Sequence, residues 1–149
     1  MSRIRAIASN IETVVEAVTP ETKFSAATFR HVVGASSQLQ LRQFAIGMTG
    51  GVRWFDEYPQ DQPGSLVAED FEIIIGYPAS DPGRNIRDAI REDVLAIQHA
   101  LLDPDNWDDD TLRSDQRTLS GYRVDFDADG QNLKGIEVTI PVTVRYRPF

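Results

Sequence analysis

The 149-residue sequence contains no cysteine and only two histidines, His31 and His99, which lie far apart in the chain. The protein therefore forms no disulfide, has no thiol nucleophile and lacks the ligand spacing of a zinc site. A chain of this length buries roughly 70% of the surface that its unfolded form exposes, so a hydrophobic core needs no such staples. We expect one domain spanning residues 1–149.

Positive charge is also scarce, because 15 basic residues face 23 acidic ones and the net charge is −8. Proteins that grip nucleic acid neutralise phosphates with lysine and arginine, so this function is not expected. Thirteen of the basic residues are arginines. Arginine suits planar recognition of carboxylates at subunit contacts, although a compositional bias of the source genome explains the same count equally well.

Long hydrophobic runs are absent, since no apolar stretch approaches the ~20 residues that span a bilayer. The N-terminus mixes polar and apolar residues and does not look like a signal peptide. We expect a soluble intracellular protein with no membrane partner. No Gly-x-Ser-x-Gly elbow occurs, and the glycines at 47, 50 and 51 precede Val52-Arg53 where a phosphate loop has Lys-Ser or Lys-Thr. We therefore predict no catalytic residues, no cofactor and no enzymatic activity.

Hydrophobic periodicity predicts two helices and four strands. Apolar residues three and four apart predict helices over 2–18 and 85–103, and period-two or β-branched patterns predict strands over 38–47, 67–77, 121–128 and 133–149. The stretch 50–65, rich in glycine and proline, is predicted to be a long loop, and the segment 20–37 is left undecided. Pro141 lacks a backbone donor, which favours an edge position or a bulge in the last strand.

These elements predict an α+β fold with the order α-β-β-α-β-β. In it, an antiparallel or mixed four-stranded sheet carries both helices on one face, since that arrangement buries both kinds of amphipathic pattern. The other face has mixed polarity, and we expect another subunit to cover part of it.

Two aspartate-rich motifs are candidates for cation sites. The sequence DFDADG at 125–130 starts like a calcium loop, but its twelfth position is Ile136 where a glutamate is needed, so a hairpin turn at Asp129-Gly130 is favoured. The aspartates around Trp107, at 103–110, lie in a hydrophilic turn and read as a solvated loop. We predict no metal site.

Arginine and aromatic residues gather in the predicted loop and mark a candidate partner or subunit interface. Such residues dominate protein interfaces. The candidates are Arg53, Trp54, Phe55 and Tyr58, together with Trp107. The alternative is that these aromatics fold back over the core of their own domain.

The second half of the chain resembles the tail terminator, or tail completion, proteins of long-tailed bacteriophages. The resemblance covers mainly residues 66–149. It rests on a strand ending in Tyr77-Pro78, a helix containing the Asp93 to Ile97 pattern, a loop with Asn106-Trp107 and a last strand that ends in an aromatic at Tyr146.

This resemblance implies a non-enzymatic structural virion protein of the phage tail or neck, assembled in the host cytoplasm. It implies a homo-hexameric ring that caps the tail tube, ends tube polymerisation and joins the head-completion (neck) protein. Genomic DNA would pass through without specific binding, and an acidic channel wall fits that task because like charges do not stick. Two alternatives stay open. One is another neck or head-tail connector component, for which twelvefold rings are expected, and the other is a small cellular enzyme or ligand-binding domain.

Overall fold

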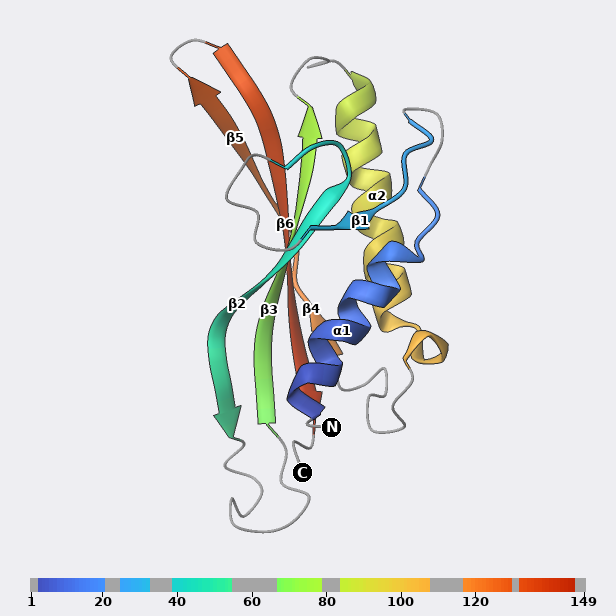
Figure 1. Cartoon of the computed structure of the whole chain (residues 1–149), viewed down its shortest axis with the longest axis vertical. Coiled ribbons are helices and arrows are strands. Elements are labelled where there is room, and N and C mark those ends of the chain that lie inside the picture. Colours follow the sequence, from blue (N-terminus) through green and yellow to red (C-terminus); the bar gives the residue numbers. More distant parts are fainter. Residues whose placement is uncertain are drawn as a thin grey trace.

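The computed structural model describes residues 3–20, 25–32, 39–54, 67–78, 84–107, 117–129 and 132–146. These ranges contain the helices α1 (Arg3–Glu16), α2 (Arg84–Leu102) and the 3₁₀ turn η1 (Pro104–Asn106), and the strands β1 (Arg30–His31), β2 (Gln43–Trp54), β3 (Val67–Pro78), β4 (Arg117–Leu119), β5 (Arg123–Asp129) and β6 (Asn132–Tyr146). Both main helices lie on one side of a twisted sheet (Figure 1). The fold is α+β, as the sequence predicts.

The sheet has six strands in the order β1-β2-β3-β6-β4, and β5 also pairs with β6. Only the β1–β2 pairing is parallel. The prediction of four strands in the order α-β-β-α-β-β was therefore wrong in number and order, because it omitted β1 and β4. These strands have two and three residues, too few to produce a period-two pattern.

The core lies between the sheet and the helices. From Ile136 to Tyr146, every second residue of β6 enters the core, because alternate side chains of a strand point to opposite faces. The buried residues of β6 are Ile136, Val138, Ile140, Val142, Val144 and Tyr146, and the helices contribute Ile7, Ile11, Val14 and Val15 from α1 and Ile86, Ile90, Val94, Ile97 and Leu101 from α2. The apolar stripes predicted for both helices are thus confirmed.

β2 differs from its prediction at both ends. Residues 41 and 42 form a turn, and the strand runs on to Trp54, so residues 50–54 belong to the sheet and not to the predicted loop. The register of the β2–β3 pairing shifts further along, between Met48 and Val52. The glycines at 50 and 51 made this part of β2 look like a loop in the sequence. The β-branched and apolar pattern typical of a strand lies in its partner, β3.

Pro141 occupies a gap in the pairing of β6. On the side away from β3, β5 pairs with β6 as far as Thr139, and β4 begins to pair at Val142. The β3–β6 register passes Pro141 without a shift. Pro141 has no backbone N–H to donate, and it lies where neither β4 nor β5 pairs with β6. At this one position β6 is therefore an edge strand on the side away from β3, as the proline requires.

β5 and β6 form the predicted hairpin. Asp129 stands opposite Asn132, so residues 130 and 131 join the two strands. This agrees with Asp-Gly as a hairpin signal rather than as part of a calcium loop.

Candidate functional site

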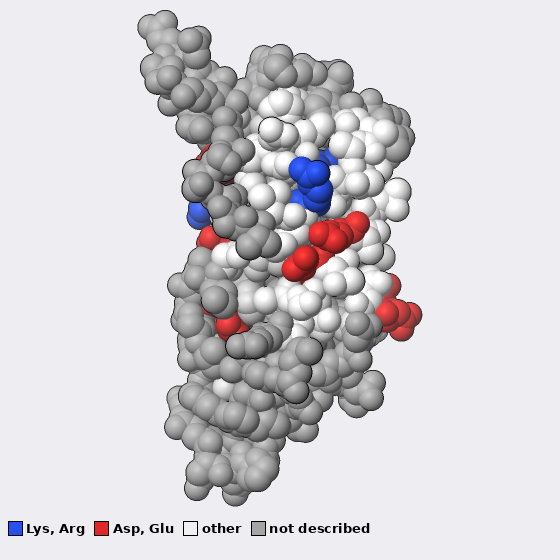
Figure 2. All heavy atoms as spheres, in the orientation of Figure 1, with Lys and Arg blue, Asp and Glu red and all other residues white. Residues whose placement is uncertain are grey.

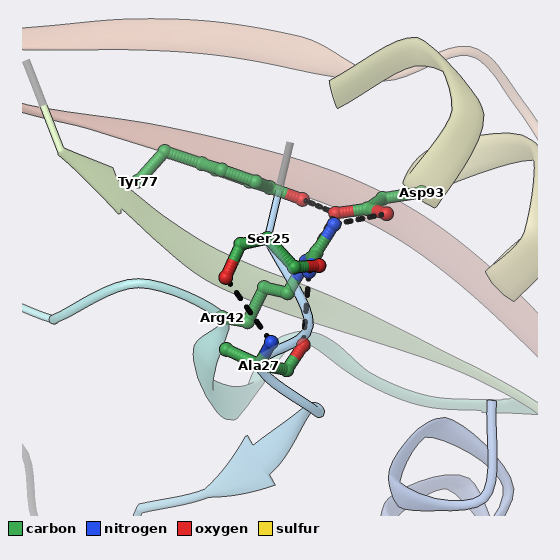
Figure 3. A network of polar contacts seen from close by, with 5 residues as sticks. All are labelled: Ser25, Ala27, Arg42, Tyr77 and Asp93. Atoms are coloured by element: carbon green, nitrogen blue, oxygen red, sulfur yellow. Dashed lines mark hydrogen bonds and ion pairs between the residues drawn. The ribbon is translucent and has the colours of Figure 1, made fainter. Parts of the chain in front are cut away.

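A fully buried cluster of polar side chains links the sheet to α2 (Figure 3). The guanidinium of Arg42 donates two hydrogen bonds to Asp93, from Nε to Oδ2 at 2.9 Å and from Nη2 to Oδ1 at 3.1 Å. The hydroxyl of Tyr77 donates to the same Oδ2 at 2.7 Å. Because Arg42 and Asp93 are completely shielded from solvent, this ion pair needs these additional hydrogen bonds to offset its desolvation.

The same guanidinium holds the segment 25–32 against the sheet. Its Nη1 donates to the backbone carbonyls of Ser25 at 2.7 Å and Ala27 at 2.9 Å. The segment then continues into β1, where the backbone of Arg30 donates to the carbonyl of Arg42. Its buried side chain, Phe29, lies beneath the guanidinium carbon at 5.7 Å from the ring centre. Arg42 thus ties the turn before β2 to two other parts of the chain, α2 and the segment 25–32.

The backbone places Arg42 at some cost. Arg42 has a φ of +54° in the turn closed by the hydrogen bond from the Gln43 amide to the Gln40 carbonyl. A left-handed conformation costs a non-glycine residue about 1 kcal/mol or more. The turn also packs directly on Gly76, where a Cβ atom would lie 2.6 Å from the Cβ of Leu39. Only glycine at 76 lets this turn reach its place.

The Tyr77 hydroxyl keeps its proton in this cluster. Burial and the neighbouring Asp93 carboxylate raise the pKa of the Tyr77 hydroxyl well above its ordinary value. The hydroxyl therefore stays protonated and keeps donating to Asp93.

A second buried pair lies near the other end of β3. The hydroxyl of Tyr146 donates to Oε2 of Glu69 at 2.8 Å, and Glu69 is only 3% exposed. Burial and the hydrogen bond to Glu69 raise the pKa of Tyr146. Both buried tyrosines thus serve as hydrogen-bond donors to carboxylates.

The predicted interface residues do not all come together. Arg53 and Trp54 lie at the end of β2, in the sheet and not in a loop. Phe55 and Tyr58 lie outside the described residues. The position of Arg53 pairs with Ala68, which in turn pairs with Arg145, so Arg53 shares one cross-strand row with a second arginine.

Trp107, the fifth candidate for a partner interface, lies in the core of the described chain. It is 7% exposed, and its indole Nε1 donates to the Leu101 carbonyl at 2.9 Å. Within the acidic loop, Asp103 Oδ1 accepts from the Asp105 amide and starts the 3₁₀ turn η1. The loop therefore turns the chain at the end of α2 and returns an aromatic to the core, where its indole satisfies a helix-end carbonyl.

The sheet face opposite the helices carries polar side chains of β3 and β6 such as Asp70, Glu72 and Thr143. Thr143 donates to Asp70 at 2.7 Å on this face. Towards β5, Arg123 pairs with Asp125 at 2.9 Å, and both side chains are more than half exposed. Neither helix of the described residues packs on this face (Figure 1), and its coverage by another subunit stays a prediction.

On the helix side, two glutamates of α1 bind His31 of β1. Glu12 pairs with Nδ1 of His31 at 3.3 Å, and Glu16 accepts from the His31 amide at 3.2 Å. Figure 2 shows a basic group above a short run of acidic groups in this region, while most of the described surface in that view is uncharged. His99, by contrast, is exposed on α2 as predicted.

Comparison with known proteins assigns no family to this arrangement. Neither a protein-family model nor a curated protein matches the chain. Among the described residues, no group of three or more acidic or histidine side chains is placed to hold a metal ion. No described helix is long and apolar enough to cross a membrane.

Sequence reasoning missed the cluster around Arg42, although one signal was present. Asp93 lies on the apolar stripe of α2, between Ile90 and Val94, and a carboxylate on a buried stripe requires a partner. Periodicity does not say which basic residue supplies it. Four of the residues that carry the phage resemblance are packing residues: Tyr77, Asp93, Trp107 and Tyr146 are buried and hydrogen-bonded.

Proposed function

We propose that this chain is a structural subunit of a bacteriophage virion, a tail terminator that forms a homo-hexameric ring on the finished end of the tail tube. The ring ends polymerisation of the tube protein and presents a surface to the head-completion protein. The proposal starts from the resemblance over residues 66–149.

One observation carries it furthest. Both helices cover one face of the sheet, and the other face and two of the sheet edges have no partner element among the described residues. A sheet of this kind offers polar side chains and unpaired backbone groups to neighbours, which is how subunits of an assembly bind one another.

The buried polar groups support a structural role in a different way. Arg42, Asp93 and Tyr77 form hydrogen bonds with one another and with backbone carbonyls inside the core. A cleft enzyme needs titratable groups that converge on a site open to substrate. In the described part of the chain, the strongest polar constellation is enclosed and holds segments in place.

The net charge of −8 supports a ring through which DNA passes. An acidic inner wall repels phosphates, so the genome slides without sticking.

The test has two measurements. Light scattering coupled to size exclusion should give a particle of six times the 16.7 kDa chain mass, either alone or with tube protein from the same phage. Electron microscopy of polymerising tube protein should show that tubes stop growing when this chain is added and that it sits at one end. A twelvefold particle that binds portal protein would favour the connector alternative, and unaltered tube growth would contradict the proposal.

A further inference from the structure

Within the part of the chain that the structure describes, two unlike edges of the sheet lack a neighbouring strand. On its outer side, β2 pairs with β1 only at Gln43 and Phe44, so residues 45–54 have no neighbouring strand among the described residues. At the opposite side of the sheet, β5 pairs with β6 alone. Long edges of this kind are normally blunted or bound by another strand.

The two edges carry opposite charge. Arg53 is the only charged residue of β2, whereas β5 contains aspartates at 125, 127 and 129 and a single arginine at 123. Pairing two β5 edges would set these aspartates against one another, and like charges across a strand pair destabilise it. Pairing β2 with β5 places Arg53 beside carboxylates instead.

We propose that the outer edge of β2 in one copy of this chain binds the β5 edge of a second copy, with Arg53 next to Asp125 or Asp127. This inference deepens the proposed function and rests on it, because it names the contact from which the ring is built. The run from Val52 to Trp54 is the part of β2 that carries the contact, since the register shift after Met48 divides the edge there.

Pairing between two unlike edges determines the symmetry of the assembly. A contact between two different surfaces of the same chain is heterologous, so every copy uses both edges and the series either closes into a ring or continues as a filament. A contact between like edges would stop at a dimer. The edge pairing thus explains how a single chain could assemble beyond two copies.

The absence of cysteine from the sequence allows a direct test. Two variants carry Arg53→Cys together with Asp125→Cys or Asp127→Cys, and they are oxidised in the presence of tube protein as well as alone. At least one should give a covalent ladder longer than a dimer on a denaturing gel. Each single substitution should give only monomer, because no copy then offers both partners.

The control pairs Arg53→Cys with Leu95→Cys, since Leu95 lies on the exposed side of α2 and away from both edges. This variant should give no ladder. A dimer from Arg53→Cys alone would show like-edge pairing and overturn the inference, as would the absence of a ladder from both double variants.

Charge gives a second readout that does not depend on oxidation. Arg53→Glu should weaken self-association about tenfold, the effect of losing one close charge pair, whereas Arg91→Glu on the exposed face of α2 should not change it. Equal effects would overturn the inference. If tubes still stop growing while the edge variants have no effect, the proposed function survives and only the edge contact fails.

Discussion

Two ion pairs of the same length show how the two faces of this sheet differ. Arg42 and Asp93 on the helix side are 2.9 Å apart and fully buried, and Arg123 and Asp125 on the other side are also 2.9 Å apart but 63% and 53% exposed. The buried pair cannot lose one member without leaving a charge in the core. The exposed pair is solvated in either state, so its contribution to stability is small.

Burial, and not distance, therefore decides how much a polar contact contributes to stability. On the covered face, polar groups fix the positions of segments. On the open face, the exposed pair of Arg123 and Asp125 can exchange water for a partner at little cost to the fold.

The largest expected effect is that of Asp93→Ala. It leaves the Arg42 guanidinium and the Tyr77 hydroxyl buried without their acceptor, which should lower the free energy of unfolding by about 3–5 kcal/mol. Asp125→Ala is the matched control and should cost no more than about 1 kcal/mol. Urea unfolding followed by circular dichroism measures both, and similar losses would remove the distinction between the faces.

Gly76→Ala should come next. Its new Cβ atom would meet Leu39 and the carbonyls of Leu39 and Gln40 at 2.6–2.7 Å, so the turn that carries Arg42 must move, at a cost of about 1–3 kcal/mol. Gly47→Ala, which has nothing within 4 Å of the added atom, should be neutral or slightly stabilising. The same unfolding measurement decides, and a tolerated Gly76→Ala would contradict the close packing of the turn.

Alkaline pH should lower the free energy of unfolding through the two tyrosines buried on the covered face of the sheet, Tyr77 and Tyr146. Tyrosine ionises at about pH 10 in an unfolded chain, whereas the pKa values of Tyr77 and Tyr146 are raised in the folded protein. Their stabilisation is therefore complete below pH 10 and is lost as the pH rises above that value. The free energy of unfolding should fall less steeply between pH 9 and 11 in Tyr77→Phe than in the parent protein.

The exposed Tyr122 provides the control for this pH dependence. Tyr122→Phe should leave the slope of the parent protein unchanged. A shallower slope in that variant would show that the alkaline loss does not come from the buried hydroxyls.

The smallest effect is expected outside the core, at Leu95→Ser. This side chain is 65% exposed on α2, so the isolated chain should lose no more than about 0.5 kcal/mol. A larger loss in unfolding experiments would mean that the outer side of α2 is already covered within the chain.

The regular part of this fold could be predicted from the sequence. Side chains such as Ile7 and Ile11 in α1, or Val138 and Ile140 in β6, repeat with the period of their element, and that period states which face is buried. The α+β class and the hairpin at Asp129 followed from such local patterns.

The irregular part could not be predicted, because it depends on contacts between distant residues. β1 is held by its pairing with β2 and by the hydrogen bond from the Arg30 amide to the Arg42 carbonyl. The two residues Arg30–His31 carry no pattern that predicts a strand. The aspartates around Trp107 predict a solvated loop, yet its indole lies in the core. For the same reason the partner of Asp93, 51 positions away in the sequence, was not identifiable from the stripe alone.

The position of Arg42 also gives the folding chain a means of checking its strand alignment. Strand side chains alternate, so a slip of one residue in the β2–β3 register moves the whole set to the opposite face. Such a slip would take the guanidinium away from Asp93 and leave the carbonyls of Ser25 and Ala27 without their donor. A misaligned sheet would thus lose its anchor to α2 and to the segment that carries β1 at the same time, so only the correct register is stabilised.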